Sequence, residues 1–352
     1  MSKVTGFGGV PKKSLLGAML ALAAATFCVP TGATAEDIKL AASAIGRPPI
    51  FSNTYADLAE AMGFYKAVGV DVTFRWFQRG DDTAKAVVTG DVAIGFTATQ
   101  PALNLIAAGA PVVAVAGVPN QDFFVGSADP AVHSCQDLKG KTIAADGINN
   151  ARYLYLQALL NTCGLDLKDI TAIDVANAPL VKASIAGQVN TAVFHVDELA
   201  QVEFKTKHKW LHIATPDALE KSLHYGVLLA SKKAISENKE GLIRFIEGWI
   251  LAQNMMSSPA AADKVAFATA AAKANGDDFD VALAAINDYQ AIGYWVNNDG
   301  LDESQMMSQL DKLVKGGTVK AAQKPTYDNI VDKSLYAEAM QRVEANFGKL
   351  KH

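Results

Sequence analysis

Two short phrases of similar sequence, in distant parts of the chain, constrain the fold more than any other feature. Residues 86–97 read AVVTGDVAIGFT, and residues 183–194 read ASIAGQVNTAVF. In each phrase, Ala is followed four positions later by Gly and two positions after that by Val. The Gly is typical of the residue that closes a helix in the left-handed conformation, and the apolar run after it predicts a buried strand. Each phrase therefore predicts a helix followed by a strand.

The similarity extends to the segments before each phrase. Both copies predict strand, helix, strand, helix and strand in that order. The first four segments are 38–46, 55–68, 70–74 and a helix ending at Gly90 in one copy, and 141–147, 152–162, 170–175 and a helix ending at Gly187 in the other. Short connections between alternating strands and helices favour right-handed crossovers and parallel sheets. The sequence thus predicts two similar α/β lobes, with chance similarity between βαβ units as the alternative.

Two further apolar runs, 123–126 and 225–230, are expected to cross between the lobes and to pair side by side as a two-strand hinge. After Ser236 the pattern becomes helical, and five helices are expected to cover the first lobe: 240–253, 260–273, 281–289, 304–314 and 335–347. The predicted domains are a signal peptide (1–35), lobe 1 with the C-terminal helices (36–123 and 231–352) and lobe 2 (124–230).

The N-terminal segment predicts export. Three Lys precede an apolar run at 15–29, and Ala33-Thr-Ala35 offers the small residues that precede a signal-peptide cleavage site. A membrane anchor is the alternative, but the run is shorter than the about 20 residues that a spanning helix needs. Cleavage after Ala35 would place the rest of the chain in the periplasm as a soluble protein.

Charge and length narrow the function classes. The formal net charge is −4 at pH 7, and no basic stripe suited to nucleic acid is present. The chain is longer than one hydrophobic core usually serves, which favours two lobes. No amphipathic seam for self-association is evident, so a monomer is expected.

Cys135 and Cys163 are predicted to form a disulfide. Cys135 precedes the strand at 141–145, and Cys163 ends the helix that follows that strand, so a βα unit brings the two together. Two buried free thiols are the alternative. No Cys-x-x-Cys is present, so the bond would be structural.

A series of motifs resembles one family. Residues 63–72 read GFYKAVGVDV, and further matching segments are VTGDVAIG (88–95), AGAPVV (108–113), DLKGKTI (137–143) and SIAGQV (184–189). In this order they resemble the NMT1/THI5-like periplasmic solute-binding proteins of ABC importers, a branch that includes nitrate, taurine and alkanesulfonate binders. The resemblance implies a type II binding-protein fold, an ABC permease and its ATPase as partners, and neither a cofactor nor catalytic residues. An enzyme of the same grouping carries a CCCFC motif that this chain lacks.

Candidate ligand-binding residues follow the predicted strands, because ligands of parallel α/β sheets bind beyond the carboxyl ends of strands. In lobe 1, an arginine that can pair with an anion and an apolar wall are expected in the loop after the first strand. Thr97 and Thr99, before a predicted helix, are the favoured hydroxyl donors. The lobe 1 candidates are Arg47, Pro49, Phe51, Arg79, Thr97, Thr99 and Gln121.

In lobe 2, Asn149 or Asn150 is expected to cap a helix. Arg152 in the first turn opposes the helix dipole, so an anion facing it is expected. His195 and Asp197 would point to one side of an extended segment, to bind a ligand amine or to hold each other, and Tyr225 would stack on a flat ligand. No metal site is expected.

These residues leave the solute open between an organic acid, a sulfonate and a nitrogen heterocycle. The predicted function is capture of that solute between two lobes and its delivery to an ABC importer. A sensor-type binding protein that signals to a membrane receptor is the first alternative. A pyrimidine-synthase-like enzyme is the second.

Overall fold

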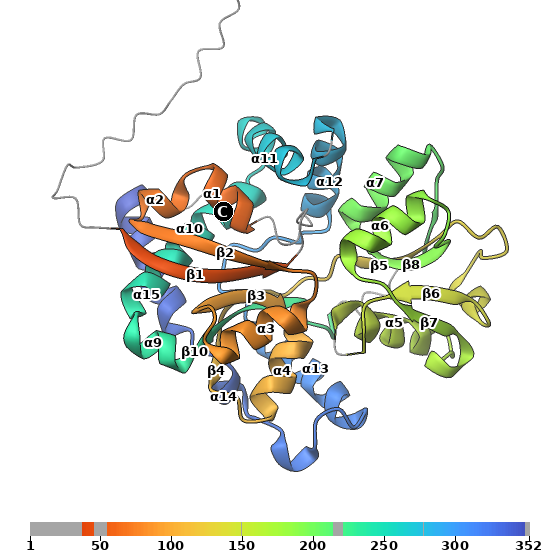
Figure 1. Ribbon diagram of the computed structural model, residues 1–352, viewed down its shortest axis with the longest axis horizontal. Coiled ribbons are helices and arrows are strands. Elements are labelled where there is room, and N and C mark those ends of the chain that lie inside the picture. Colours follow the sequence, from red (N-terminus) through yellow and green to blue (C-terminus); the bar gives the residue numbers. More distant parts are fainter. Residues whose placement is uncertain (1–36, 46–54, 149, 214–220, 277, 349–352) are drawn as a thin grey trace, which may run out of the picture. The chain divides into compact units, whose positions relative to one another are not determined.

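Two five-stranded mixed sheets form the frame of the chain in the computed structural model, which describes residues 37–45, 55–148, 150–213, 221–276 and 278–348 (Figure 1). The predicted signal peptide, together with Arg47, Pro49, Phe51 and Asn149, lies outside the described residues. Both sheets belong to one unit, Glu36–His352.

The first sheet has the strand order β2-β1-β3-β10-β4. Its strands are β1 (Ile38–Ile45), β2 (Val70–Phe77), β3 (Ile94–Ala98), β4 (Val112–Val118) and β10 (Gly226–Ser231). β1 runs parallel to β2 and β3, while β10 runs antiparallel to β3 and β4. The carboxyl ends of β1 to β4 therefore lie at one edge.

The second sheet repeats this plan in the order β7-β6-β8-β5-β9. Its strands are β5 (Phe123–Ser127), β6 (Thr142–Ala145), β7 (Thr171–Asp174), β8 (Thr191–His195) and β9 (Leu211–Ile213). β6 runs parallel to β7 and β8, and β5 runs antiparallel to β8 and β9. In each sheet, one antiparallel strand pairs with the parallel strands: β10 in the first sheet and β5 in the second. The chain enters each of these strands directly after leaving the other sheet.

The two quoted phrases form the same structure. Helix α3 (Gly80–Thr89) ends at Gly90, with φ 80°, ahead of β3, and helix α6 (Asn177–Ile185) is followed by Gly187, with φ 70°, ahead of β8. The helix expected over 55–68 is instead two helices, α1 (Tyr55–Ala61) and α2 (Phe64–Ala67). The break lies at Gly63, whose φ of 71° is left-handed.

The predicted pairing of the two apolar runs is wrong. Residues 123–126 lie in β5 of the second sheet, and residues 226–230 lie in β10 of the first. Both are strands buried within a sheet, where neighbouring strands satisfy their backbone groups, and such strands read as continuous apolar runs. The segments just before them lie side by side instead: Tyr225 N donates to Pro119 O (3.3 Å), and Gln121 Nε2 donates to Leu223 O (3.2 Å).

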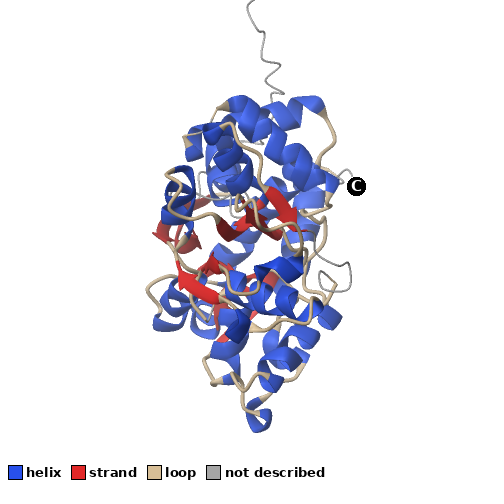
Figure 2. Ribbon diagram, turned by 90° about the vertical axis from the view of Figure 1, so that its right-hand side faces the viewer, coloured by secondary structure: helices blue, strands red, loops and turns tan. Residues whose placement is uncertain are grey.

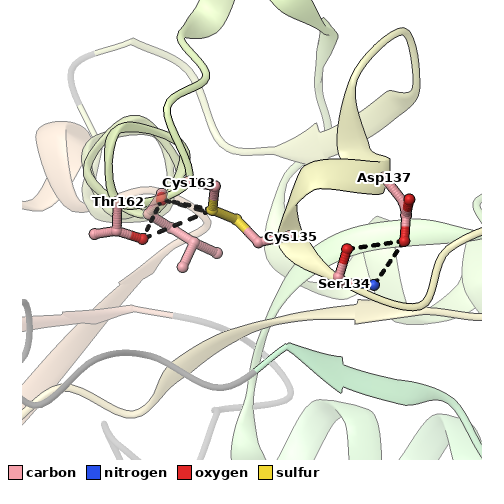
Figure 3. The surroundings of a disulfide bond; sticks show 6 residues. Ser134, Cys135, Asp137, Thr162 and Cys163 are labelled. Carbon is pink, nitrogen blue, oxygen red and sulfur yellow. Dashed lines mark hydrogen bonds between the residues drawn. A yellow bond between two sulfur atoms is a disulfide. The ribbon is translucent and has the colours of Figure 1, made fainter.

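The predicted disulfide is confirmed. Cys135 begins the short 3₁₀ helix η2 (Cys135–Leu138), and Cys163 is the C-cap of α5 (Ala151–Thr162), with Cα atoms 6.0 Å apart (Figure 3). Asp137 fixes the start of η2, because its Oδ2 accepts from the backbone N and the hydroxyl of Ser134, both at 2.9 Å.

The predicted helical C-terminal region is confirmed. Its helices are α9 (Lys232–Glu237), α10 (Lys239–Ser257), α11 (Ala261–Asn275), α12 (Phe279–Ala291), α13 (Glu303–Lys315), α14 (Tyr327–Ile330) and α15 (Ser334–Phe347). Helix α10 packs against β1, α1, α2 and α15, but α12 packs against α7 (Val196–Thr206), which follows β8 of the second sheet. The expectation that all these helices cover the first lobe is therefore wrong for α12.

Helices enclose the strands of both sheets (Figure 2). The aromatic core between α10 and α2 is closely packed, since the rings of Tyr65 and Phe245 stack with centroids 5.1 Å apart. Across the described ranges, no helix is long and apolar enough to span a bilayer.

Candidate functional site

Residues at the carboxyl ends of strands from both sheets line one cavity. Side chains at the ends of β1, β2 and β3 meet side chains at the ends of β6 and β8, with Phe123 from the start of β5 and Tyr225 from just before β10. The lining residues are Ile45, Gln78, Arg79, Gly80, Ala98, Phe123, Asp146, Asn150, Ala151, Arg152, His195 and Tyr225. The volume is about 20 Å³, which is room for about one water molecule. This space is called the cleft cavity below.

Three polar contacts join the loops of the two sheets around the cleft cavity. Arg79 Nη2 donates to Asp174 Oδ1 at 2.7 Å, with the two side chains 27% and 55% exposed. The backbone N of Asp81 donates to Asn150 Oδ1 (3.3 Å), and Gln100 Nε2 donates to the backbone O of Ile148 (3.2 Å). These contacts hold the strand ends close together and leave the cavity small.

Asn150 performs a different role from the one predicted. It occupies the N-cap position of α5, but its side chain makes no capping hydrogen bond to that helix. The carbonyl oxygen of its side chain accepts from Asp81 instead. The residue thus connects the two sheets, and α5 begins without the side-chain cap that the sequence suggested.

Arg152 has an anionic partner within the protein. Its guanidinium donates to Glu198 through Nη1 (2.7 Å) and Nη2 (2.8 Å), and Nη1 also donates to the backbone O of Val193 (2.7 Å). Arg152 is 1% exposed and Glu198 3% exposed. This forked, buried pair explains the arginine in the first turn of α5 without a bound anion. Truncating Arg152 would leave the Glu198 charge buried alone, so such a variant would not keep the fold unaffected.

Thr97 and Thr99 are not available as donors to a ligand. Thr97 Oγ1 donates to the backbone O of Gly80 (2.6 Å), and Thr99 Oγ1 lies 2.8 Å from His224 Nδ1. His224 Nε2 lies 2.7 Å from the backbone O of Gly300, which can only accept, so Nδ1 accepts the Thr99 proton. Burial lowers the pKa of His224 to about 4, which keeps the ring neutral. Both hydroxyl protons are therefore used inside the protein.

His195 and Asp197 do not lie on an extended segment as predicted. Helix α7 begins at Val196, because Glu198 accepts from the backbone N of His195 (2.9 Å) as the third residue of a capping box does. His195 lines the cleft cavity, whereas Asp197 does not. Burial lowers the pKa of His195 well below its usual value, so the ring is neutral.

His195 and Asp197 are linked through Asp122 and Tyr289. Asp122 Oδ2 lies 2.7 Å from His195 Nδ1 and accepts from the hydroxyl of Tyr289 at 2.7 Å, while that same hydroxyl lies 2.8 Å from Asp197 Oδ1. A phenol has one hydrogen and can donate to only one carboxylate at a time. The other contact requires a proton on a carboxyl group, and burial raises the pKa of Asp122 to about 7.

The predicted site residues thus separate into groups. The cleft cavity brings together Arg79, Asn150, Arg152, His195 and Tyr225. Tyr225 is 4% exposed, and its ring is held edge-on by Phe123 and His195, at centroid distances of 5.6 and 5.9 Å. Gln121 lies instead beside a different cavity at the connecting segments.

Sequence reasoning missed Asp146, which follows β6 and lines the cleft cavity. Its Oδ1 accepts from the backbone N of Tyr153 (3.0 Å). Burial raises the pKa of Asp146 to about 7, although Arg152 and Arg79 act in the opposite direction. Its position at the carboxyl end of a predicted strand was the signal that could have identified it. In the described part of the chain, no three His, Cys, Asp or Glu side chains are grouped as metal ligands.

Solved structures with the same arrangement are known. A protein from Bordetella bronchiseptica RB50 has 21% identity and a TM-score of 0.71, over 87% of this chain and 98% of its own. The alkanesulfonate-binding protein SsuA from Xanthomonas axonopodis pv. citri, bound to MOPS, has 17% identity and a TM-score of 0.68, over 84% and 99%. The periplasmic nitrate-binding protein NrtA from Synechocystis PCC 6803 has 16% identity and a TM-score of 0.70, over 90% and 91%.

These likenesses confirm the predicted type II periplasmic-binding-protein fold, with two α/β sheets and a helical C-terminal region. No curated protein matches the sequence. The family model described as NMT1/THI5 like matches residues 51–262, which is more than half of the chain. The chain therefore belongs to the NMT1/THI5-like family.

Proposed function

We propose that this protein is exported to the periplasm, captures a small organic solute in the cleft cavity and delivers it to an ABC permease with its ATPase. Lobe 1 would comprise residues 36–123 and 231–352 and lobe 2 residues 124–230, as the sequence suggests. One adjustment is needed, because β10 pairs within the first sheet. The second lobe would therefore end before Gly226.

The observation that carries this proposal is the convergence of strand ends from two sheets on one cavity, around which three polar contacts join loops of the two sheets. Loops at the carboxyl ends of parallel strands are where α/β proteins bind ligands. Two such edges on separate sheets can move apart and close around a solute. In the present conformation the cavity is too small for an organic molecule, so capture requires opening.

Three solute classes remain: an organic acid, a sulfonate and a nitrogen heterocycle. Both described arginines of the cleft cavity already have carboxylate partners, Asp174 for Arg79 and Glu198 for Arg152. An anionic solute would have to compete with those carboxylates. A heterocycle could donate its N–H groups to Asp146 and Asn150, whose side chains accept from Tyr153 and Asp81 but keep further acceptor capacity. We therefore favour the nitrogen heterocycle for this cleft.

Binding without chemistry is the simplest function for this geometry. The two alternatives make distinct predictions. A sensor would bind the same solute but be captured by a membrane receptor rather than by a permease. An enzyme would convert the solute, so a changed product or a changed protein mass after incubation would identify it.

A thermal-shift screen of sulfonates, aromatic acids, pyrimidines and amino acids tests solute capture. A solute at a hundred times its Kd stabilises the protein by about 2.7 kcal/mol. Ala151→Trp would fill the cleft cavity from the first residue of α5 and should abolish the shift. Ala261→Trp, at the exposed first residue of α11, is the matched control and should retain it. The proposal fails if no panel member shifts the melting temperature, or if every observed shift survives Ala151→Trp.

A further inference from the structure

A second and larger cavity lies at the segments that connect the two sheets. Its volume is about 380 Å³, within the range of about 300–1,000 Å³ that small-molecule sites occupy. The two cavities share one lining residue, Phe123. This second space, called the side cavity below, has walls from the segment before β5, from β9 and from the ends of α12 and α13.

One wall of the side cavity is formed by two stacked rings and an aliphatic side chain. The Phe124 ring stacks on the His212 imidazole with centroids 4.9 Å apart and planes 14° apart. These residues lie on the adjacent strands β5 and β9. Ile292, at the end of α12, lines the same cavity and is 50% exposed. Such a surface suits a planar ring.

Two buried oxygen atoms of the lining residues, Asp122 Oδ1 and Gln305 Oε1, have no hydrogen-bond partner among the other residues that the structure describes. Asp122 is only 2% exposed, and its second oxygen, Oδ2, already contacts His195 and Tyr289. Asp122 Oδ1 can accept whether the group is ionised or carries its proton on Oδ2, and the amide carbonyl oxygen of Gln305 is an acceptor as well. An acceptor buried without a partner costs about 1–3 kcal/mol, so a molecule that donates to both would recover this cost.

We infer that the side cavity is a second ligand site, separate from the cleft cavity, for a small planar molecule with N–H donors of the amidine or primary carboxamide class. The ring would pack against the open side of the Phe124–His212 stack, and the N–H groups would donate to Asp122 and Gln305 once these side chains turn toward the ligand, since both oxygens are buried here. Lys221 also lines this cavity, and its ammonium group is a donor for an acceptor atom on the ligand. Because Asp122 contacts His195, which lines the cleft cavity, occupancy of one site can alter the other.

Three probes with one ring test the ligand class. Benzamidine and benzamide carry N–H donors, whereas benzoate has the same shape and only acceptors. Calorimetric titration of the mature protein should show binding of at least one of the two donors and binding at least tenfold weaker for benzoate.

Variants test the location. Ile292→Trp fills the side cavity from a half-exposed position and should weaken donor binding at least tenfold. Ile185→Trp, at an exposed Ile on α6, is the matched control and should leave binding unchanged. Gln305→Met removes one acceptor at similar size and should also weaken donor binding without unfolding the protein, as circular dichroism would verify.

The inference is overturned if neither benzamidine nor benzamide binds, if benzoate binds as well, or if Ile292→Trp leaves binding unchanged. These outcomes leave the proposal of solute capture untouched, because that proposal is tested with Ala151→Trp. Ala151 lines the cleft cavity and not the side cavity. A probe displaced by Ala151→Trp and retained by Ile292→Trp would belong to the cleft.

Discussion

At the scale of single residues, the cleft cavity is lined by ionisable groups that are shielded from water. Arg152 is neutralised by Glu198, His195 is held neutral by burial, and Asp146 is half-buried beside two arginines. Desolvation disfavours a charge unless a partner compensates it. For Asp146 the compensation is incomplete, since burial raises its pKa to about 7.

We therefore expect Asp146 to make the protein less stable as the pH rises from about 4 to about 7. The folded protein keeps the proton in this window, and the unfolded chain, with the pKa near 3.8, releases it. More protons are then bound in the folded state, so the free energy of unfolding falls with pH, by at most about 4 kcal/mol.

Asp146→Asn removes this pH-dependent contribution to the free energy of unfolding. Urea unfolding should show the variant gaining stability relative to the parent between pH 4 and pH 7. The buried histidines act in the opposite direction, because His195 and His224 have lowered pKa values, but they are present in both proteins and cancel in the difference. A difference that does not change with pH would contradict the raised pKa of Asp146.

At the scale of elements, sequence pattern was sufficient for most of the fold. Glycines with positive φ follow the helices of both phrases, at Gly90 and Gly187, so the repeated order of helices and strands was predictable. The pairing of β5 and β10 was not, because an apolar run indicates burial and not which neighbour a strand takes.

The site was less predictable than the fold for a related reason. Strand ends identified Arg79, Asn150 and His195 as lining residues, but a side chain's partner depends on tertiary contacts. Thr99 bonds to His224, which is distant in sequence, and Arg152 bonds to Glu198 across two elements. No local pattern encodes such pairs.

The disulfide offers a test at this scale. It joins η2 to the end of α5, with 28 residues of sequence separation, and closing a loop of this length should stabilise the protein by about 2–4 kcal/mol. The double variant Cys135→Ala, Cys163→Ala should lower the free energy of unfolding in urea by that amount. Reductant should destabilise the parent similarly and leave the variant unchanged. Equal unfolding midpoints for parent and variant would show that the bond adds no stability.

At the scale of the whole unit, the contacts between the two sheet edges would set how readily the proposed cleft opens. The Arg79–Asp174 pair is partly exposed, and exposed ion pairs contribute about 0.2–1 kcal/mol. Losing it would shift the ratio of closed to open molecules by up to about fivefold.

Asp174→Asn should therefore increase the radius of gyration of the ligand-free protein in small-angle X-ray scattering, most visibly at low salt, where the pair is least screened. Arg75→Gln is the matched control, because the Arg75–Asp91 pair (3.7 Å) is also exposed but lies within the first sheet and its connections. An equal increase in both variants would indicate a general effect of surface charge.

The single hydroxyl hydrogen of Tyr289 has a further consequence. Tyr289 belongs to α12, Asp197 to α7 and Asp122 to the segment that connects the sheets, so the extra hydrogen ion demanded by two carboxyl groups around one phenol is shared by three separate elements. A movement that separates these elements would break the contacts that stabilise the bound hydrogen ion, and the ion would pass to the solvent. Opening would then release a proton to the solvent and closing would take one up. The acidity of the medium would therefore influence the lifetime of the closed form.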